Sequence, residues 1–399
     1  MSRLLPGASG DPDASGDPDA APAYESRPAA VPAGRPAGPP TGRTAAHPAA
    51  GRPAASKAAR PGTVLLTAAR RTVTTALLLA LIPAVVAVLI AVTVLGAPVS
   101  LPSRGPWRPS RMACFVLVYL LVDLSGLLAA AALFLRAPRA TRERRAAEAF
   151  ALLARLLAVL RRSAERLFRL RVETTPAPPT AVRTSAPDTP LVVFVRHAGL
   201  GDSFLLLQLL LTEAGLLPHT VLKGVLRADP CLDVLLGRVP HCFLPPADGT
   251  AENAIGALAA GLRPRDALVI FPEGGNFTPH RHRRAVAALR RLGQYRRAAR
   301  AARLRYVLPP RDAGSLAILA AAPTADVVFV GHAGLDVIAS PRAAWSFLPF
   351  RGPVRVHWWR VPAAEIPAGD AARSEWLLGQ WERMDRWTAA QAVPATPHA

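Results

Sequence analysis

A histidine and an aspartate flank a glycine-rich turn directly after a run of apolar residues. The run is Leu191–Val195, and the turn that follows reads RHAGLGDS, with His197 and Asp202 separated by four residues. A histidine oriented by a carboxylate can take the proton of an incoming hydroxyl group. The spacing therefore predicts an acid/base pair. Two alternatives remain open at this point: a hydrolase with Ser203 as nucleophile, and a surface turn in which Asp202 caps a helix.

A second apolar run also ends in a glycine-rich turn. It reads LVIFPEGGNFTP from Leu268 to Pro279, and it places Glu273, Gly274 and Gly275 at the end of a predicted strand. Successive backbone N–H groups in such a turn can hold a phosphate or another polar group. We expect this turn to bind the polar part of a substrate. Taken alone, the segment is equally typical of an ordinary glycine-rich turn.

Short apolar segments alternate with helical patterns over the residues that carry these motifs. Strands are predicted at Leu191–Val195, Ala267–Phe271 and Asp326–Val330. Helices are predicted at Ser203–Ala214 and Arg281–Leu292. The alternation predicts an α/β domain with a central sheet flanked by helices.

Two long apolar segments precede this domain, at Val73–Leu95 and Met112–Leu135. Each exceeds the roughly 20 residues that a helix needs to cross a bilayer. Arginines are more frequent on the outer flanks than in the connecting loop, so the positive-inside rule places both flanks in the cytoplasm. We therefore predict a two-helix transmembrane hairpin over residues 63–136, in a multi-pass protein of the cell membrane with its catalytic domain on the cytoplasmic face. Asp123 is expected to face the partner helix, with a proton site as the alternative.

The remaining segments differ from the domain in composition. Residues 1–62 are rich in Ala, Pro and Gly and bury too little apolar surface to offset the entropy of ordering, so they are predicted to be disordered. Residues 137–171 predict an amphipathic Arg/Leu helix, either on anionic lipid or packed on the domain. Residues 172–190 are predicted to be a Pro/Thr linker, and residues 388–399 a second disordered tail.

The composition combines 51% hydrophobic residues with a formal net charge of +21. The apolar fraction favours a membrane protein, and the charge favours an anionic partner. Lys57 and Lys223 are the two lysines, so arginine supplies nearly all of the positive charge, which is typical of a compositional bias. Since no aromatic-rich basic motif is present, we expect no nucleic-acid partner. The three cysteines lack the spacing of a metal site, and no metal is expected.

In this order and spacing, the motifs resemble the glycerolipid acyltransferases, the 1-acyl-sn-glycerol-3-phosphate and lysocardiolipin acyltransferase family with its PlsC-type domain. RHAGLGD is similar to the histidine–aspartate box, and FPEGG is similar to the third block, FPEGTR. LKGVLRADPCLDVLLGRVPHCFL resembles the second block, with Lys223 and Pro230 in the expected places. LPPRDAG, Leu308 to Gly314, is similar to a Pro-Arg-x-x-Gly segment of the long-chain branch. The likeness covers residues 191–387, about half of the chain.

The resemblance implies an α/β acyltransferase domain over residues 191–387 and a membrane-bound O-acyltransferase. Such an enzyme transfers a fatty acyl group from acyl-CoA, or from acyl-carrier protein, to the hydroxyl of a lysophospholipid acceptor. The expected acceptor is 1-acyl-sn-glycerol-3-phosphate, in phospholipid biosynthesis or remodelling. His197 is implied as general base and Asp202 as the group that fixes its tautomer. The residues implied in substrate binding are Lys223, Glu273, Gly274, Gly275, Arg311 and Arg196. Membrane lipids are the other implied partners, and neither a cofactor nor a metal is expected.

The sequence departs from the family pattern at three positions. Arg196 replaces an Asn before the histidine, Pro246 replaces the Arg of the second block, and Asn276 replaces the Arg of the third block. Two arginines that bind phosphate in the family are therefore missing. Either Arg196, Arg238 or Arg281 takes their place, or the acceptor is not phosphorylated. A third interpretation is a degenerate domain that acts as a lipid-binding scaffold.

Overall fold

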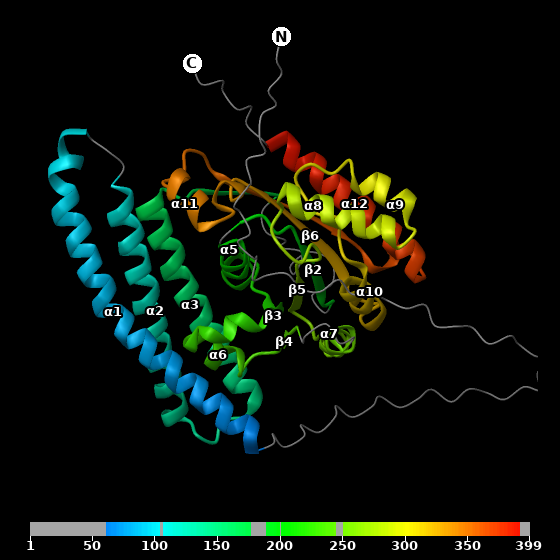
Figure 1. Ribbon diagram of the computed structural model, residues 1–399. Coiled ribbons are helices and arrows are strands. Elements are labelled where there is room, and N and C mark those ends of the chain that lie inside the picture. The colour runs from blue at the N-terminus through cyan, green and yellow to red at the C-terminus, as the bar shows by residue number, and fades with distance from the viewer. Residues whose placement is uncertain (1–60, 104–106, 177–188, 200, 245–249, 392–399) are drawn as a thin grey trace, which may run out of the picture.

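A seven-stranded sheet with helices on both faces forms the centre of the chain (Figure 1). The computed structural model describes residues 61–103, 107–176, 189–199, 201–244 and 250–391. The strands are β1 Val172–Thr175, β2 Leu191–Val195, β3 Leu217–Leu222, β4 His241–Phe243, β5 Asp266–Ile270, β6 Asp326–Ala333 and β7 Val354–Val361. Their order in the sheet is β1-β7-β6-β2-β5-β3-β4. Strands β2 to β6 run parallel, whereas β7 is antiparallel to β6 and parallel to β1.

The three strands predicted from apolar runs are confirmed. β2 has the predicted bounds, β5 begins and ends one residue earlier than predicted, and β6 continues three residues further. Every residue of these three strands is buried, as in a parallel sheet covered on both faces. Because these strands are parallel, their carboxyl ends lie at one edge of the sheet. Both glycine-rich turns follow strands at this edge.

The described helices of seven residues or more are α1 Pro61–Ser103, α2 Arg108–Arg136, α3 Arg142–Phe168, α5 Asp202–Gln208, α6 Pro230–Leu236, α7 Ala251–Ala260, α8 Pro279–Arg291, α9 Tyr295–Ala301, α10 Asp312–Ala321, α11 Pro341–Phe347 and α12 Asp370–Gln391. Helices α3, α5 and α11 pack on one face of the sheet, around Val193 and Val195. Helices α7, α10 and α12 pack on the other face, around Val192 and Phe194. Alternate side chains of β2 therefore belong to two separate cores.

Segments predicted as tails and linkers contain regular structure where they are described. Val172–Thr175, predicted as the start of a linker, forms β1, which pairs with the edge of β7. The second tail was predicted from residue 388, yet α12 continues to Gln391 because the side chain of Thr388 is buried and its Oγ1 donates to the Met384 carbonyl. The predicted disorder of residues 1–60 and 392–399 and most of the linker, residues 177–188, lie outside the described residues.

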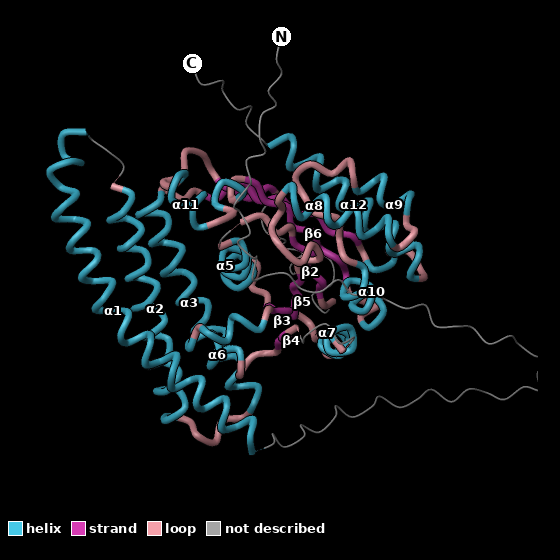
Figure 2. The backbone as a smooth tube through the Cα atoms, viewed as in Figure 1, coloured by secondary structure: helices cyan, strands magenta, loops and turns pink. Residues whose placement is uncertain are grey.

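The two predicted membrane segments lie within α1 and α2. By length and composition, both helices suffice to cross a membrane. Figure 2 shows α1, α2 and α3 side by side along one flank of the domain, with α6 beside them, and α2 contacts each of the other three. Asp123 of α2 was expected to face α1; instead its Oδ1 accepts the backbone N–H of Cys231 at 3.0 Å, in the first turn of α6. The carboxylate thus satisfies a helix N–H that lacks an intrahelical partner.

The amphipathic segment predicted at residues 137–171 forms α3, which packs against the domain. Its buried residues include Phe150, Leu153, Leu157 and Phe168. Phe168 belongs to the core beneath the sheet, and the other three form a cluster with residues of α2 and α6. Of the two alternatives for this helix, the structure agrees with packing on the domain, because its apolar stripe is covered by protein.

Candidate active site

His197 and Asp202 are in hydrogen-bond contact at the carboxyl edge of the sheet. Nδ1 of His197 lies 2.7 Å from Oδ2 of Asp202. The turn between β2 and α5 needs the left-handed backbone of Gly201, with φ of 85°, which favours glycine. The Asp202 side chain is 3% exposed, whereas that of His197 is 24% exposed. The aspartate is thus fixed within the protein, and one side of the imidazole is open to a substrate.

The surroundings of Asp202 favour its ionised form. Burial acts to raise its pKa, but the hydrogen bond and charge of His197, the charge of His332 and the N–H of Ala198 outweigh burial and hold the pKa below its usual value. His332 is buried, and burial lowers its pKa. An ionised Asp202 that accepts from Nδ1 keeps the proton on that nitrogen and the lone pair on Nε2. His197 is therefore arranged to accept a proton through Nε2.

The alternative nucleophile, Ser203, is also turned toward Asp202. Its Oγ donates to Asp202 Oδ1 at 3.3 Å, and its backbone N–H donates to the same oxygen at 2.7 Å. A nucleophilic serine needs its hydroxyl proton to face a base, and here that proton faces a carboxylate that is already bonded to His197. The arrangement does not favour the hydrolase alternative.

Glu273, expected to bind substrate, is buried and bonded to the protein backbone. Its Oε1 accepts the N–H of His197 at 3.0 Å, and its Oε2 accepts the N–H of Leu308 at 2.8 Å. The side chain is 2% exposed. Burial raises the pKa of Glu273 to about 7, although Arg196 and the two N–H donors oppose this shift. In this geometry Glu273 holds the backbone of His197 in place, and its role in substrate binding stays a prediction.

Arg196, a second expected substrate ligand, is also buried. Its side chain is 2% exposed, forms a salt bridge of 2.6 Å with Asp336, and donates from Nη2 to the Tyr306 carbonyl at 2.9 Å. Nη1 donates to the carbonyl of His332, whose own Nε2 lies 2.8 Å from the Arg196 carbonyl. These contacts engage both terminal nitrogens of the guanidinium group, so Arg196 ties β2 to β6, and its role as a phosphate ligand stays a prediction.

Two other arginines converge on the Gly274–Gly275 turn. Gly274 has a φ of 69°. A Cβ atom on Gly274 would lie 2.8 Å from Cζ of Arg311, and one on Gly275 would lie 3.2 Å from Nη1 of Arg281. Desolvation and then the neighbouring charge of Arg281 lower the pKa of Arg311, although Arg311 is an exposed residue overall. Two guanidinium groups that meet at a glycine turn favour an anion between them.

The other expected ligands lie in different places. Lys223 is exposed and follows β3, so it shares the carboxyl edge of the sheet with His197. Arg238 faces α2, where its Nη2 donates to the Ala130 carbonyl at 3.1 Å. Asn276 stands in place of the third-block arginine, and its Nδ2 donates to the Ala339 carbonyl at 3.2 Å. Pro246 lies outside the described residues.

Three features of the site were missed by sequence reasoning. The ring of Phe271 lies 4.9 Å from the ring of His197 and covers one side of it. The backbone of Leu308 reaches Glu273 because Asp385 of α12 accepts the N–H groups of residues 305, 306 and 307 and so fixes the loop before it. LPPRDAG was recognised as a motif, but Asp385, which bonds the three residues before it, comes from a helix more than 70 residues later.

The side chains that commonly bind metal ions are not grouped around one point in the described residues. Within the described residues, no group of three or more His, Cys, Asp or Glu side chains is placed to hold a metal ion. Cys231 packs against Gly126 of α2, and Cys242 is buried in β4. The two cysteines thus belong to separate packing clusters.

Comparisons with known proteins give one structural likeness. No family model matches the chain, and no curated protein matches it in sequence. A solved structure, the 1-acyl-sn-glycerophosphate (LPA) acyltransferase PlsC from Thermotoga maritima, is similar with 14% identity and a TM-score of 0.46. The likeness covers 72% of this chain and 100% of that chain. A likeness of this extent does not establish a shared activity or substrate.

Proposed function

We propose that this protein is an O-acyltransferase that acts at a membrane surface. It transfers a fatty acyl group from a thioester, acyl-CoA or acyl-carrier protein, to the hydroxyl of a lysophospholipid. The observation that carries the proposal is the His197–Asp202 pair, in which a buried carboxylate orients a partly exposed imidazole. The FPEGG turn supports it, because Glu273 bonds the backbone of His197 and so joins the two motifs in one site.

The reaction needs a base, since a neutral hydroxyl is a weak nucleophile. In this mechanism Nε2 of His197 takes the hydroxyl proton while the acceptor oxygen attacks the thioester carbonyl carbon. The C–S bond then breaks, and the departing thiolate takes the proton from the imidazolium. Asp202 stabilises the imidazolium through Nδ1–H, as the carboxylate does in a Ser-His-Asp triad. The acyl group passes directly to the acceptor, with no covalent enzyme intermediate.

We assign Arg281 and Arg311 to the phosphate of the acceptor. They lie at the turn that carries Asn276, the position where the family has an arginine. Arginine forks bind phosphate through paired hydrogen bonds, and two positive charges suit its charge. Lys223, at the same edge of the sheet, provides a third cation. The expected acceptor is therefore phosphorylated, with 1-acyl-sn-glycerol-3-phosphate as the first candidate.

The proposal is tested by incubating membranes that contain the protein with acyl-CoA and a panel of acceptors. The panel holds lysophosphatidate, other lysophospholipids and non-phosphorylated alcohols, and free thiol is measured alongside the acylated product. We expect a phosphorylated acceptor to be acylated, and His197→Ala to lower the rate by roughly 10²–10⁴. His280→Ala, at an exposed residue of α8, is the matched control and should keep the wild-type rate. If neither wild type nor His197→Ala releases thiol with any acceptor, the scaffold interpretation replaces the proposal.

A further inference from the structure

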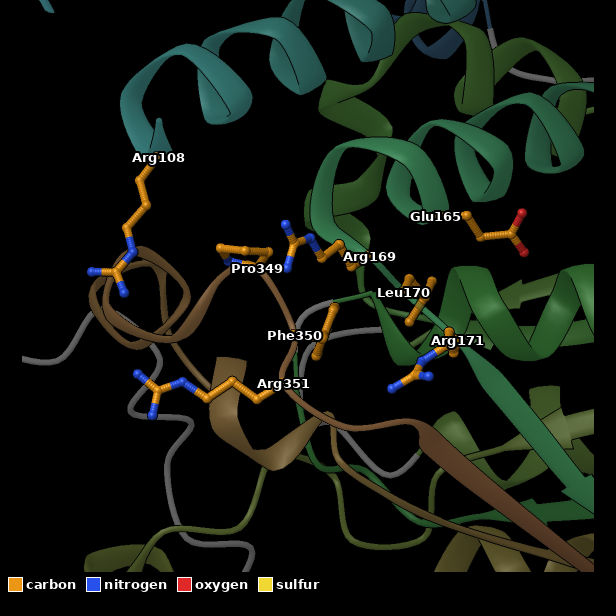
Figure 3. Close-up of a pocket in the computed structure, with 8 residues that line it drawn as sticks. All are labelled: Arg108, Glu165, Arg169, Leu170, Arg171, Pro349, Phe350 and Arg351. Carbon is orange, nitrogen blue, oxygen red and sulfur yellow. The ribbon is translucent and has the colours of Figure 1, made fainter. Parts of the chain in front are cut away.

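A cleft of about 910 Å³ lies at the end of α3, apart from the His197 site. Figure 3 shows that its lining combines four arginines with apolar side chains: Arg108, Arg169, Arg171 and Arg351, with Leu170 and Phe350. A cleft of this size is typical of a site for an organic ligand and exceeds what a single small ion needs. The lining therefore suits a ligand that has both anionic and flat apolar parts.

Three of these arginines have guanidinium groups that the described protein leaves unbonded. Arg169, Arg171 and Arg351 are exposed, and their side chains form no hydrogen bond or ion pair with the described residues. Glu165, the acidic residue of the lining, is bonded to Arg161 at 2.9 Å. The repulsion among the arginines is therefore balanced only in part, and an anionic ligand in the cleft would complete the balance.

The backbone of Arg169 has a conformation that favours glycine. This residue caps the end of α3 with a φ of 57° and a ψ of 34°. Helices commonly end in glycine at such a position, because a Cβ atom makes the left-handed region less stable. Here the position carries an arginine whose side chain lines the cleft. Residues held in such backbone conformations cluster at functional sites, which fits a binding role for this side chain.

The topology of the sheet brings the cleft to the same edge as His197. β7 is antiparallel to β6, so its start lies beside the end of β6, where Arg355 is opposite Ala333. β1 is parallel to β7 and therefore starts at the same edge. Most of the lining residues precede β1 or β7. These strands are three and two positions from β2 in the sheet, which places the cleft roughly 10–14 Å along the edge from β2 at about 4.8 Å per strand.

One segment connects the cleft with the His197 turn. Residues 334–353 leave the end of β6 and return to the start of β7. Near the beginning of this segment, Asp336 forms the salt bridge of 2.6 Å with Arg196. Near its end, residues 349–351 line the cleft. The segment thus contacts the catalytic turn at one end and the arginine cleft at the other.

A nucleotide with several phosphates has the chemistry that this lining recognises. Arginine forks bind phosphate oxygens through paired hydrogen bonds. Guanidinium planes and aromatic rings such as that of Phe350 can stack on a base. CoA, the thioester carrier named above, contains a diphosphate, a further phosphate on the ribose and an adenine base. Its pantetheine arm, when extended, spans a distance of the order that separates the cleft from β2.

We infer that this cleft binds the nucleotide of the acyl-CoA donor, at a site separate from the Gly274–Gly275 turn assigned to the acceptor. Arg169, Arg171 and Arg351 hold its phosphates, and Phe350 contacts its base. The identity of the nucleotide rests on the proposed acyl transfer. The site distinguishes acyl-CoA from acyl-carrier protein, because the prosthetic group of a carrier protein has one phosphodiester and no base.

Equilibrium binding tests the site without catalysis. Detergent-solubilised full-length protein is titrated with CoA, dephospho-CoA, glycerol 3-phosphate and inorganic phosphate. We expect CoA to bind most tightly, dephospho-CoA less tightly, and the two small phosphates at least roughly tenfold more weakly than CoA, since they form fewer charge-assisted hydrogen bonds. If glycerol 3-phosphate or inorganic phosphate binds as tightly as CoA, the cleft holds a headgroup or a free anion, and the nucleotide assignment is overturned.

A double variant places the binding in this cleft. Arg171→Ala combined with Arg351→Ala should raise the Kd for CoA at least roughly tenfold, as expected for the loss of two charge-assisted hydrogen bonds. Arg166→Ala is the matched control, because this arginine is exposed in the last turn of α3 and does not line the cleft. The control should keep the wild-type Kd. A wild-type Kd in the double variant would overturn the assignment.

A substitution at Arg169 separates binding from folding. Because glycine suits a φ of 57°, Arg169→Gly should leave the midpoint of thermal unfolding unchanged or raise it. The same variant should raise the Kd for CoA several-fold, because one phosphate ligand is lost. A lowered midpoint with an unchanged Kd would assign Arg169 to the fold and remove it from the site.

His197→Ala distinguishes a wrong assignment of the cleft from a wrong assignment of the reaction. His197 does not line the cleft, so His197→Ala should bind CoA with the wild-type Kd. CoA bound through the cleft arginines, with no acyl transfer to any acceptor, would support the site and contradict the proposed function. Acyl transfer with an unchanged KM for acyl-CoA in the Arg171→Ala and Arg351→Ala variant would support the proposed function and overturn the site.

Discussion

Two pairs of charged residues near His197 differ in what surrounds them. Arg196 and Glu273 are each 2% exposed, and protein groups bond Nη1 and Nη2 of Arg196 and both carboxylate oxygens of Glu273. Arg281 and Arg311 lie at the Gly274–Gly275 turn, where each guanidinium group approaches a glycine. All four residues belong to the motifs or their flanks, so their positions in the sequence do not separate them. Their burial does: Arg196 and Glu273 are buried and bonded to the protein backbone, whereas Arg281 and Arg311 are less buried, and we expect these two to reach a ligand.

The largest expected effect on stability comes from Glu273→Gln. An amide in place of the carboxylate presents an NH₂ group to the N–H of either His197 or Leu308, which leaves a buried donor without an acceptor. We expect a loss of about 1–3 kcal/mol in the free energy of unfolding, together with lower activity because His197 is displaced. Chemical denaturation measures the free energy of unfolding, and an acyl-transfer assay measures the activity. An unchanged stability with a raised KM would instead assign Glu273 to the substrate.

The contribution of Glu273 to the free energy of unfolding is expected to depend on pH. Burial raises the pKa of Glu273 from its ordinary value of 4.5 to about 7. The folded protein therefore retains a proton there that the unfolded chain releases between these values. The contribution of Glu273 to stability decreases as the pH rises through this window. The free energy of unfolding of the wild type minus that of Glu273→Gln should decrease as the pH rises through this window. A difference that increases with pH would contradict the assignment.

The effect expected for the arginines at the turn is on acceptor binding and not on stability. Loss of one charge-assisted hydrogen bond to phosphate costs about 1.5–3 kcal/mol, so Arg311→Ala should lower kcat/KM for a phosphorylated acceptor roughly 10- to 100-fold. Stability should change little, because Arg311 is exposed. Arg284→Ala, at an exposed residue of the same helix as Arg281, is the control. Equal losses with phosphorylated and non-phosphorylated acceptors would remove Arg311 from phosphate binding.

The parts of the fold predicted from the sequence are those with a local signal. LVVFV forms β2 as predicted because its apolar β-branched residues suit a buried strand. β1 and β4 were missed because VETT and HCF are short, and β1 in addition pairs with β7, which lies far along the chain. The two long apolar helices were recognised by length, but their position beside the domain depends on contacts such as that of Arg108 with Leu348.

In the candidate site, too, the contacts within one turn could be predicted, whereas the contacts between distant segments could not. His197 and Asp202 are five positions apart, so one turn brings them together, and this spacing together with the other motifs indicated the pair. The contacts of Arg196 and Glu273 involve Tyr306 and Leu308, which follow a different helix. A motif therefore predicts which residues are near the site, whereas burial by distant segments determines which of them can touch a substrate.

The central claim is direct acyl transfer with His197 as base, and a single-turnover experiment tests it most directly. Protein in excess is mixed with acyl-CoA labelled in the acyl group and with lysophosphatidate, then quenched in acid at successive times. The account predicts that label passes from the thioester to the phospholipid product, with none bound to protein, and that His197→Ala and Asp202→Asn slow this transfer while Ser203→Ala does not. Label attached to protein and lost in Ser203→Ala, or transfer at the wild-type rate in His197→Ala, would contradict it.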